Sequence, residues 1–242
     1  MRWQPLALVL VLALTSCRES VIHSEPLEAL LTTEQRAEYR MFREEATFTR
    51  ILHRNFTSDM QTYDFLLNRL DFLGLCMREL KIRPYIIKPR GDGSFDFDDT
   101  RGIRGVMREW VKGVGRRLFR ASVTGRGPLG IEVKAEVLML LEYSQHAAPG
   151  TVQNSLEVFV KLGGFAGAMA PLILPLAGRT FDERIDSVLG GARDLSELIS
   201  RDPALFLHRV GHSPGIPSDE VLKVRRFLDE QGKLEHENPG GP

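Results

Sequence analysis

The chain has 242 residues, and its 32 lysines and arginines balance 32 aspartates and glutamates, so the formal net charge at neutral pH is zero. This balance gives no electrostatic reason to expect nucleic acid as a partner. Hydrophobic residues make up 43% of the chain. A chain of this size can bury roughly 70% of its surface around one core, so we expect a single domain.

The N-terminus has the three parts of an export signal: a positive start at Arg2, an apolar stretch over residues 6–14, and small residues before Cys17. The apolar stretch is too short to span a bilayer. The run Leu-Thr-Ser-Cys that ends at Cys17 resembles the lipobox of bacterial lipoproteins, a signature that unrelated proteins share. The resemblance implies cleavage before Cys17 and acylation of Cys17. Plain secretion and a retained helix are the alternatives.

The same resemblance divides the N-terminal region into a signal peptide at residues 1–16 and a tether at residues 17–25. Several acyl chains would hold the protein durably at a membrane. Arg18 stands where many Gram-negative lipoproteins that stay in the inner membrane have aspartate. The resemblance therefore implies the periplasmic face of the outer membrane. With Cys17 acylated, the chain's other cysteine, Cys76, has no partner for an internal disulfide, and its apolar neighbours predict a buried core residue.

From residue 26 to 231 the apolar residues mostly recur at helical spacing, which predicts one helical domain. Thr32 and Gln35 form a capping-box signature that begins a helix to about residue 55, and Ser58 and Gln61 begin a second helix to about residue 81. We expect these two helices to pack as a hairpin. Further helices are expected at 101–120, 131–146, 151–162, 180–200, 203–210 and 218–231.

Residues 85–88 and 94–97 flank a Pro- and Gly-containing turn and predict a β-hairpin. Residues 232–242 predict a disordered tail. The predicted fold class is therefore mainly α: a single-domain helical bundle with one small β-hairpin.

The segment 101–120 has the sharpest charge pattern. At about 100° per residue, its basic residues form one stripe of a helix with apolar residues opposite. The stripe consists of Arg104, Arg108, Lys112, Arg116 and Arg120. Such a cationic amphipathic helix can bind an anionic membrane surface or an acidic partner. Alternatively its apolar face is core, and its arginines are solvated or paired with the aspartates at 96, 98 and 99.

Residues 162–178 contain no charged side chain but include Pro171 and Pro175. Each proline removes a helical hydrogen bond that lipid cannot replace, so the sequence favours burial inside the domain. A membrane-inserting hairpin and an exposed groove for a partner are the alternatives.

Four motif matches predict neither catalysis nor metal binding. Residues 211–215 read G-x-S-x-G, but Pro214 lacks the N–H that an oxyanion hole needs. Residues 125–130 read G-x-G-x-x-G outside any βαβ pattern. His208 and His212 lack the glutamate of a metalloprotease motif, and the aspartates from Asp92 onward lack the glycine and glutamate of a calcium loop. No catalytic residue, metal ligand or cofactor is predicted.

The sequence favours a non-enzymatic lipoprotein of the bacterial envelope that binds a protein partner or acts as a scaffold, in secretion, motility or toxin immunity. The alternative is a membrane-active protein that engages a bilayer through 101–120 and 162–178. An enzyme is the third reading.

Overall fold

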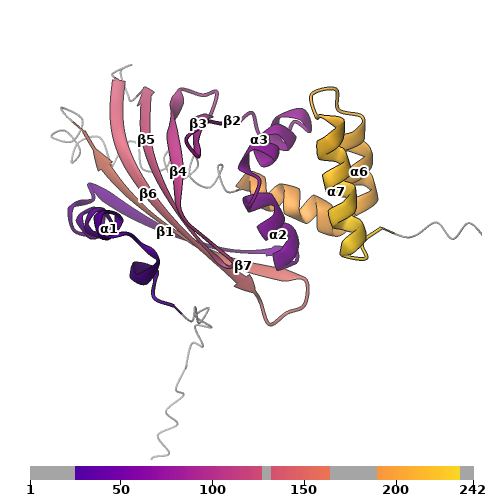
Figure 1. The fold of residues 1–242 in the computed structure, drawn as a ribbon, viewed down its shortest axis with the longest axis horizontal. Helices are drawn as coiled ribbons and strands as arrows, with labels where there is room; N and C mark the ends of the chain where they lie inside the picture. The colour runs from indigo at the N-terminus through magenta and orange to yellow at the C-terminus, as the bar shows by residue number, and fades with distance from the viewer. Residues whose placement is uncertain (1–24, 127–131, 164–189, 235–242) are drawn as a thin grey trace, which may run out of the picture.

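The computed structural model describes residues 25–126, 132–163 and 190–234. Its centre is a seven-stranded, fully antiparallel sheet with the strand order β1-β7-β6-β5-β4-β3-β2 (Figure 1). The strands are β1 (Phe48–Thr57), β2 (Ile86–Pro89), β3 (Ser94–Asp98), β4 (Ile103–Gly113), β5 (Arg116–Arg126), β6 (Glu132–Gln145) and β7 (Thr151–Leu162). Strands β2 to β7 follow one another as neighbours, whereas β1 joins the far edge beside β7.

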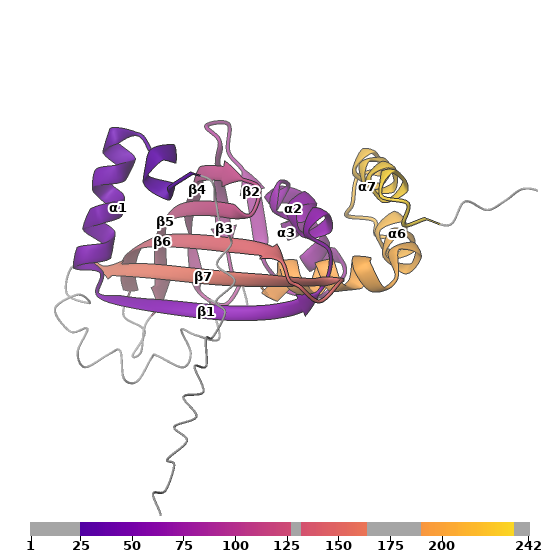
Figure 2. The ribbon, with the colours of Figure 1, turned by 90° about the horizontal axis from the view of Figure 1, so that it is seen from below.

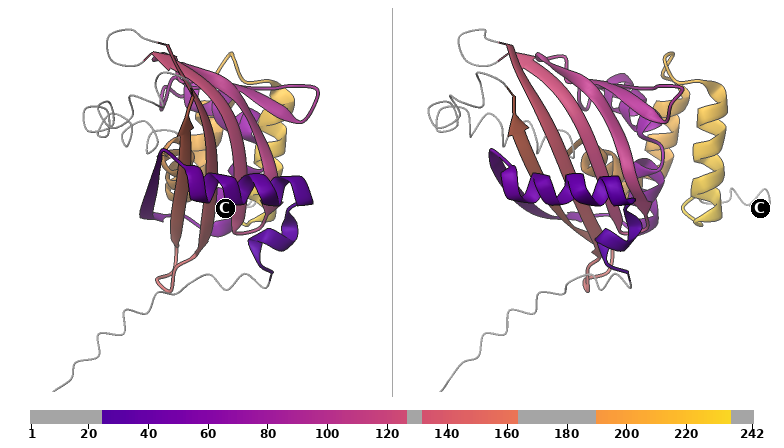
Figure 3. Two further views of the ribbon diagram at one scale, coloured as in Figure 1. Left: turned by 90° about the vertical axis from the view of Figure 1, so that its left-hand side faces the viewer. Right: turned by 60° about the vertical axis from the view of Figure 1, so that its left-hand side comes forward.

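Helices cover both faces of this sheet. The 3₁₀ helix η1 (Leu27–Leu30) and helix α1 (Thr33–Glu45) lie on one face, where α1 crosses the strands (Figures 2 and 3). Helices α2 (Met60–Leu67) and α3 (Leu70–Glu79) and the helical residues 190–201 lie on the other face. Helices α6 (Pro203–Gly211) and α7 (Ser218–Glu230) form a pair beyond them (Figure 1).

Two apolar clusters hold these layers together. The smaller one joins Tyr39 and Phe42 of α1 to Leu118, Leu138 and Phe159 of the sheet. The larger one fills the space between the opposite sheet face and α2, α3 and residues 190–201. Because successive side chains of a strand point to opposite faces, the central strands supply both clusters at once.

The predicted mainly α bundle is wrong, and the largest correction concerns residues 101–162. Helices were predicted at 101–120, 131–146 and 151–162, but the described residues of these segments form strands β4 to β7 and the turns beside them. A spacing of four residues marks one face of a helix, but it also marks one face of a strand, whose period is two. Strands covered on both faces also read as continuous apolar runs, which periodicity alone does not distinguish from buried helices.

The first two predicted helices are also shorter than expected. The helix predicted from residue 32 to 55 ends at Glu45, and β1 follows from Phe48. The helix predicted from 58 to 81 is broken into α2 and α3 at Asn68 and Arg69. The expected hairpin between the two helices is absent, because α1 packs on the sheet face opposite to α2 and α3.

Several local predictions are confirmed. The backbone N–H of Gln35 donates to Thr32 Oγ1 at 3.2 Å and that of Thr32 donates to Gln35 Oε1 at 3.0 Å, which completes the capping box. The hairpin of β2 and β3 and helices α6 and α7 lie where the sequence predicts them. Cys76 is fully buried in α3.

Other predictions fall on residues outside the described ranges. These are the signal peptide at 1–16, almost all of the tether, the apolar stretch from residue 164 onward, and the tail from residue 235. Among the helices that the structure describes, none is long and apolar enough to span a bilayer.

Candidate functional site

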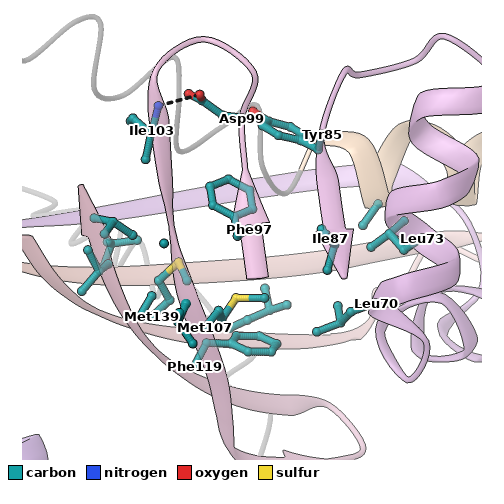
Figure 4. A pocket seen from close by; sticks show the side chains of 18 of the residues that line it. Leu70, Leu73, Tyr85, Ile87, Phe97, Asp99, Ile103, Met107, Phe119 and Met139 are labelled. Atoms are coloured by element: carbon teal, nitrogen blue, oxygen red, sulfur yellow. Dashed lines mark hydrogen bonds between the residues drawn. The ribbon is translucent and has the colours of Figure 1, made fainter. Parts of the chain in front are cut away.

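An apolar cavity of about 140 Å³ lies between the sheet and helix α3 (Figure 4). Strands β2 to β7, the end of α2, α3 and residue 192 all contribute to its wall. The lining residues are Leu67, Leu70, Leu73, Met77, Tyr85, Ile87, Phe97, Asp99, Ile103, Gly105, Val106, Met107, Phe119, Ala121, Val123, Val137, Met139, Leu141, Leu156, Val158 and Ala192. Apart from Tyr85 and Asp99, the lining side chains are hydrocarbon or thioether.

The alternation of side chains along a strand and the repeat of an α-helix explain how these side chains meet. On β5, Phe119, Ala121 and Val123 alternate with residues of the other sheet face, and β6 repeats this pattern. On α3, Leu70, Leu73 and Met77 share one helix face. Gly74 allows α3 to lie close to β2, because a Cβ there would stand 2.8 Å from Cβ of Ile87. The alternation of the strands and this close approach together shape the cavity.

The side chains that line the cavity differ in how far they are exposed to solvent. Leu73, Met77 and Leu141 are buried, whereas Ile87 and Met107 are only half-buried. Phe97, Val123 and Met139 are half-buried as well, so the wall is partly exposed along β2 to β6 and buried where α3 covers it.

The polar side chains of the wall are together at one end. The β2–β3 register pairs Ile86 with Asp98, so Tyr85 and Asp99 flank this pair directly (Figure 4). Asp99 is only 4% exposed. Its Oδ1 accepts hydrogen bonds from the backbone N–H groups of Arg101 at 2.8 Å and Ile103 at 2.7 Å. These two bonds fix the carboxylate and the tight connection from β3 to β4.

Arg117 forms a buried polar cluster beside the cavity, next to the lining residues Leu67 and Leu141. Its Nη2 donates to Asp64 Oδ1 at 2.7 Å, its Nη1 to Glu109 Oε1 at 3.1 Å and its Nε to the Tyr143 hydroxyl at 3.3 Å. Burial disfavours the charged guanidinium, but the hydrogen bonds and charges of these partners outweigh burial and raise the pKa of Arg117. Sequence reasoning missed this cluster, because its members lie far apart in the chain.

A second polar cluster joins the start of α2 to the end of the described chain. Asp59 Oδ1 accepts from the backbone N–H of Thr62 at 2.8 Å and so caps α2. Lys233 Nζ donates to Asp59 Oδ2 at 2.5 Å. Burial alone would raise the pKa of Asp59, but the hydrogen bonds from Lys233 and Thr62 hold it below its ordinary value.

The five predicted cationic residues do not form one stripe. Arg108 and Arg120 are direct cross-strand partners, whereas Lys112 pairs with the inward-facing Arg117 and so lies on the other sheet face. The irregular register between Glu109 and Val111 causes this change of face.

Three of these five residues make ion pairs. Arg108 pairs with Asp92 at 2.7 Å, and Arg116 pairs with Glu142 at 2.9 Å. Arg120 pairs with Glu38 of α1 at 2.6 Å. Arg104 and Lys112 are exposed. Most of the cationic residues thus serve contacts within the domain.

Ser213 of the G-x-S-x-G match and the two histidines at 208 and 212 lie in α6 or in the turn that follows it. Ser213 follows α6 in a turn, with its backbone N–H donating to Val210 O at 3.3 Å. The rings of His208 and His212 stack at 4.2 Å. Within the part of the chain that the structure describes, no three histidine, cysteine, aspartate or glutamate side chains are grouped so that they could hold a metal ion.

The chain matches no protein-family model and no curated protein. Among solved structures, a conserved protein from Geobacillus kaustophilus is similar at 11% identity, over 61% of this chain and 93% of that chain, with a TM-score of 0.47. A START superfamily protein from Mycobacterium smegmatis is similar at 11% identity, over 61% and 98%, with a TM-score of 0.39. Similarities this low do not assign a family or a function to the chain.

Proposed function

We propose that this protein binds a small apolar molecule in the cavity between its sheet and helix α3. The observation that carries the proposal is the cavity itself, whose wall is almost wholly hydrocarbon and thioether. Protein interiors are normally close-packed, and voids larger than a water molecule are few. A space of about 140 Å³ between the sheet and the helix layer is therefore larger than the voids that close packing normally leaves.

The physical chemistry of the wall favours an apolar occupant. Engineered cavities of about 150 Å³ lined by leucine, isoleucine and phenylalanine stay dry and bind benzene. Each methylene group that leaves water for such a site contributes about 0.8 kcal/mol. Water is a poor occupant of this cavity, because it needs several polar partners and most of the wall offers none.

The wall can also adapt to ligands of different shape. Met77, Met107 and Met139 line the cavity from a helix and two strands. Methionine is unbranched and polarisable, so it fills irregular gaps and changes rotamer at little cost. We therefore expect ligands somewhat larger than the empty volume to bind as well.

Isothermal titration with toluene or octan-1-ol tests this proposal. Ala121 lines the cavity, so Ala121→Leu places three additional carbon atoms in it and should weaken binding at least about tenfold, by occupying the ligand's volume. The matched control is Ser122→Val on the next residue, whose exposed side chain points to the other sheet face. Equal binding by wild type and Ala121→Leu would contradict the proposal.

We further propose that binding takes place at the envelope membrane, with the domain tethered through an acylated Cys17. The lipobox-like run before Cys17 supports this part, and it lies outside the described residues. The predicted protein partner and the predicted non-enzymatic role stay predictions. The bilayer-active alternative required a cationic helix at 101–120, and this segment instead forms β4, a turn and the start of β5.

A further inference from the structure

We propose that the domain docks on a lipid bilayer through one end of its sheet, where Val114 lies in the β4–β5 turn and residues 147–149 lie in the β6–β7 turn. This inference rests on the proposed tether through an acylated Cys17, and it adds which end of the domain meets the membrane. Its basis is the position of these two turns, their exposed apolar side chains, and the place where the tether joins the domain.

The two turns lie at the same end of the sheet, beside the neighbouring strands β5 and β6. The backbone N–H of Tyr143 on β6 donates to the carbonyl oxygen of Gly115 at 2.9 Å, so the β4–β5 turn is level with Tyr143. Strand β6 ends shortly afterwards at Gln145, and β7 begins at Thr151. The β6–β7 turn therefore projects just beyond the β4–β5 turn, in the same direction.

Both turns present apolar side chains to solvent. Val114 is 73% exposed, more than any other large hydrophobic residue that the structure describes. Residues 147–149 read Ala-Ala-Pro and are exposed too. Glycines close both turns with positive φ, 77° at Gly115 and 69° at Gly150. Neither 112–115 nor 146–150 includes aspartate or glutamate, so the turns place no acidic side chain against anionic lipids.

The start of the described chain is fixed at this same end. Arg116, the first residue of β5, donates from Nη1 to the carbonyl oxygen of Glu25 at 2.9 Å, and it pairs with Glu142 of β6 at 2.9 Å. The 3₁₀ helix η1, which follows Glu25 closely, lies at the end of the sheet that carries the β6–β7 turn (Figure 3). Leu30 of η1 is 42% exposed and adds to the apolar surface.

The tether is short compared with the domain. The chain from Cys17 to Glu25 advances at most about 3.6 Å per residue, so it reaches no further than about 29 Å. Strand β6 alone, with 14 residues, is roughly 46 Å long. An anchor at Cys17 therefore favours contact between the bilayer and this end of the sheet. Tethering also gives an effective concentration of about millimolar, at which a shallow apolar contact is enough to dock the domain.

Quenching of tryptophan fluorescence by brominated lipid tests this docking, because bromine on an acyl chain quenches a tryptophan that enters the bilayer. The chain from Cys17 onward, which contains every described residue, is coupled through the Cys17 thiol to a maleimide lipid in vesicles of phosphatidylcholine with brominated acyl chains. The fully buried Cys76 does not compete for the maleimide. This anchor replaces acylation, so the result does not depend on whether cells acylate Cys17.

We expect the tryptophan of Val114→Trp to be quenched at least about threefold more strongly than that of Leu222→Trp, because apolar residues on a membrane surface enter it by about 5–10 Å. Leu222 is the matched control, since it is 62% exposed near the start of α7. The connection between α6 and α7 lies at the opposite end of the molecule from the β6–β7 turn (Figures 1 and 3). Trp110 is the common background of both variants.

A second reporter separates docking of the native turn from an effect of the new tryptophan. Ala148→Trp places the reporter in the β6–β7 turn. Adding Val114→Asp should reduce its quenching at least about threefold, because a charge on the apolar tip opposes entry into lipid. The matched control is Ile51→Asp, which adds the same charge at a 54% exposed position of β1 and should leave the quenching of Ala148→Trp unchanged.

The outcomes keep this inference apart from the proposed function. Equal quenching of Val114→Trp and Leu222→Trp, including none in either, or quenching of Ala148→Trp that Val114→Asp does not reduce, would overturn this docking end. Fatty-acid labelling of Cys17 and calorimetry on the cavity decide the two parts of the proposed function separately. Circular dichroism shows whether each variant folds, and if Val114→Trp does not, the Ala148→Trp series decides.

Discussion

Arg117 on β5 and Asp64 on α2 are joined by a hydrogen-bonded ion pair of 2.7 Å, and the Arg117 side chain is only 1% exposed. The pair links the sheet to the helix layer beside Leu67 and Leu141, which line the cavity. The same guanidinium also holds Glu109 of β4 and Tyr143 of β6. One buried cation therefore fixes α2 against three neighbouring strands.

Replacing this cation should cost much of the domain's stability. Arg117→Leu leaves the carboxylates of Asp64 and Glu109 without their partner, and breaking a buried ion pair in this way typically costs about 3–5 kcal/mol. Urea unfolding followed by circular dichroism measures the change. Arg108→Gln is the control: it breaks the exposed pair with Asp92 and should cost about 0–1 kcal/mol. Similar losses in both variants would show that Arg117 is not a structural centre.

The ion pair of Asp59 and Lys233 should make stability depend on acidity. The pKa of Asp59 is lower in the folded chain than its ordinary value, so its carboxylate contributes stability above about pH 4, and this contribution is lost as pH falls through the folded-state pKa. Asp59→Asn keeps a good helix cap but removes the charge.

We therefore expect Asp59→Asn to lower the free energy of unfolding at pH 7 by about 0.5–1 kcal/mol, because the pair is partly exposed. The difference from wild type should shrink at about pH 2.5, where the wild-type carboxyl is increasingly protonated. Denaturant titrations at both pH values give the comparison. A difference that grows on acidification would contradict this role of Asp59.

The thiol of Cys76 should be unreactive in the folded protein. It is fully buried, and burial raises its pKa, which reduces the reactive thiolate. In a Cys17→Ser background, a thiol reagent should react slowly with native protein and rapidly after denaturation. Equal rates in both states would show that α3 does not hold Cys76 in the core.

Acylation of Cys17 is tested by labelling cells with a fatty acid and separating membrane from soluble fractions. Cys17→Ser should lose the label and move out of the membrane fraction, because several acyl chains are needed for durable anchoring. Cys76→Ser should keep both properties. Label that persists in Cys17→Ser would rule out this anchor.

The sequence predicted the helices with clear end signals and missed most of the sheet. Thr32, Asp202 and Pro217 precede or cap helices that begin where expected, because capping is a local interaction, although the helix after Thr32 ends earlier than predicted. The apolar residues of β1, Phe48, Leu52 and Phe56, recur every four residues. That spacing fits one face of a helix and one face of a strand equally well, and the pairing with β7 that decides between them is not local.

The candidate site was less predictable than the fold. The regular spacing of the arginines at 104, 108, 116 and 120 predicted a binding surface. The buried Arg117 lies among them in the sequence, and it is the residue that joins the sheet to α2. The cavity needs β2 to β7 and α3 together, so no single segment carries a signal for it. The alternation of Phe119, Ala121 and Val123 was the available hint, since two-residue periodicity over β5 contradicts a helix.

Methyl NMR of the methionines tests ligand binding in the cavity most directly. Met77, Met107 and Met139 line it, whereas Met41 packs in the cluster on the opposite sheet face. On titration with octan-1-ol, the methyl signals of the three lining methionines should shift together with one binding curve, and that of Met41 should stay in place. Shifts of equal size at all four, or none at Met77, Met107 and Met139, would contradict binding between the sheet and α3.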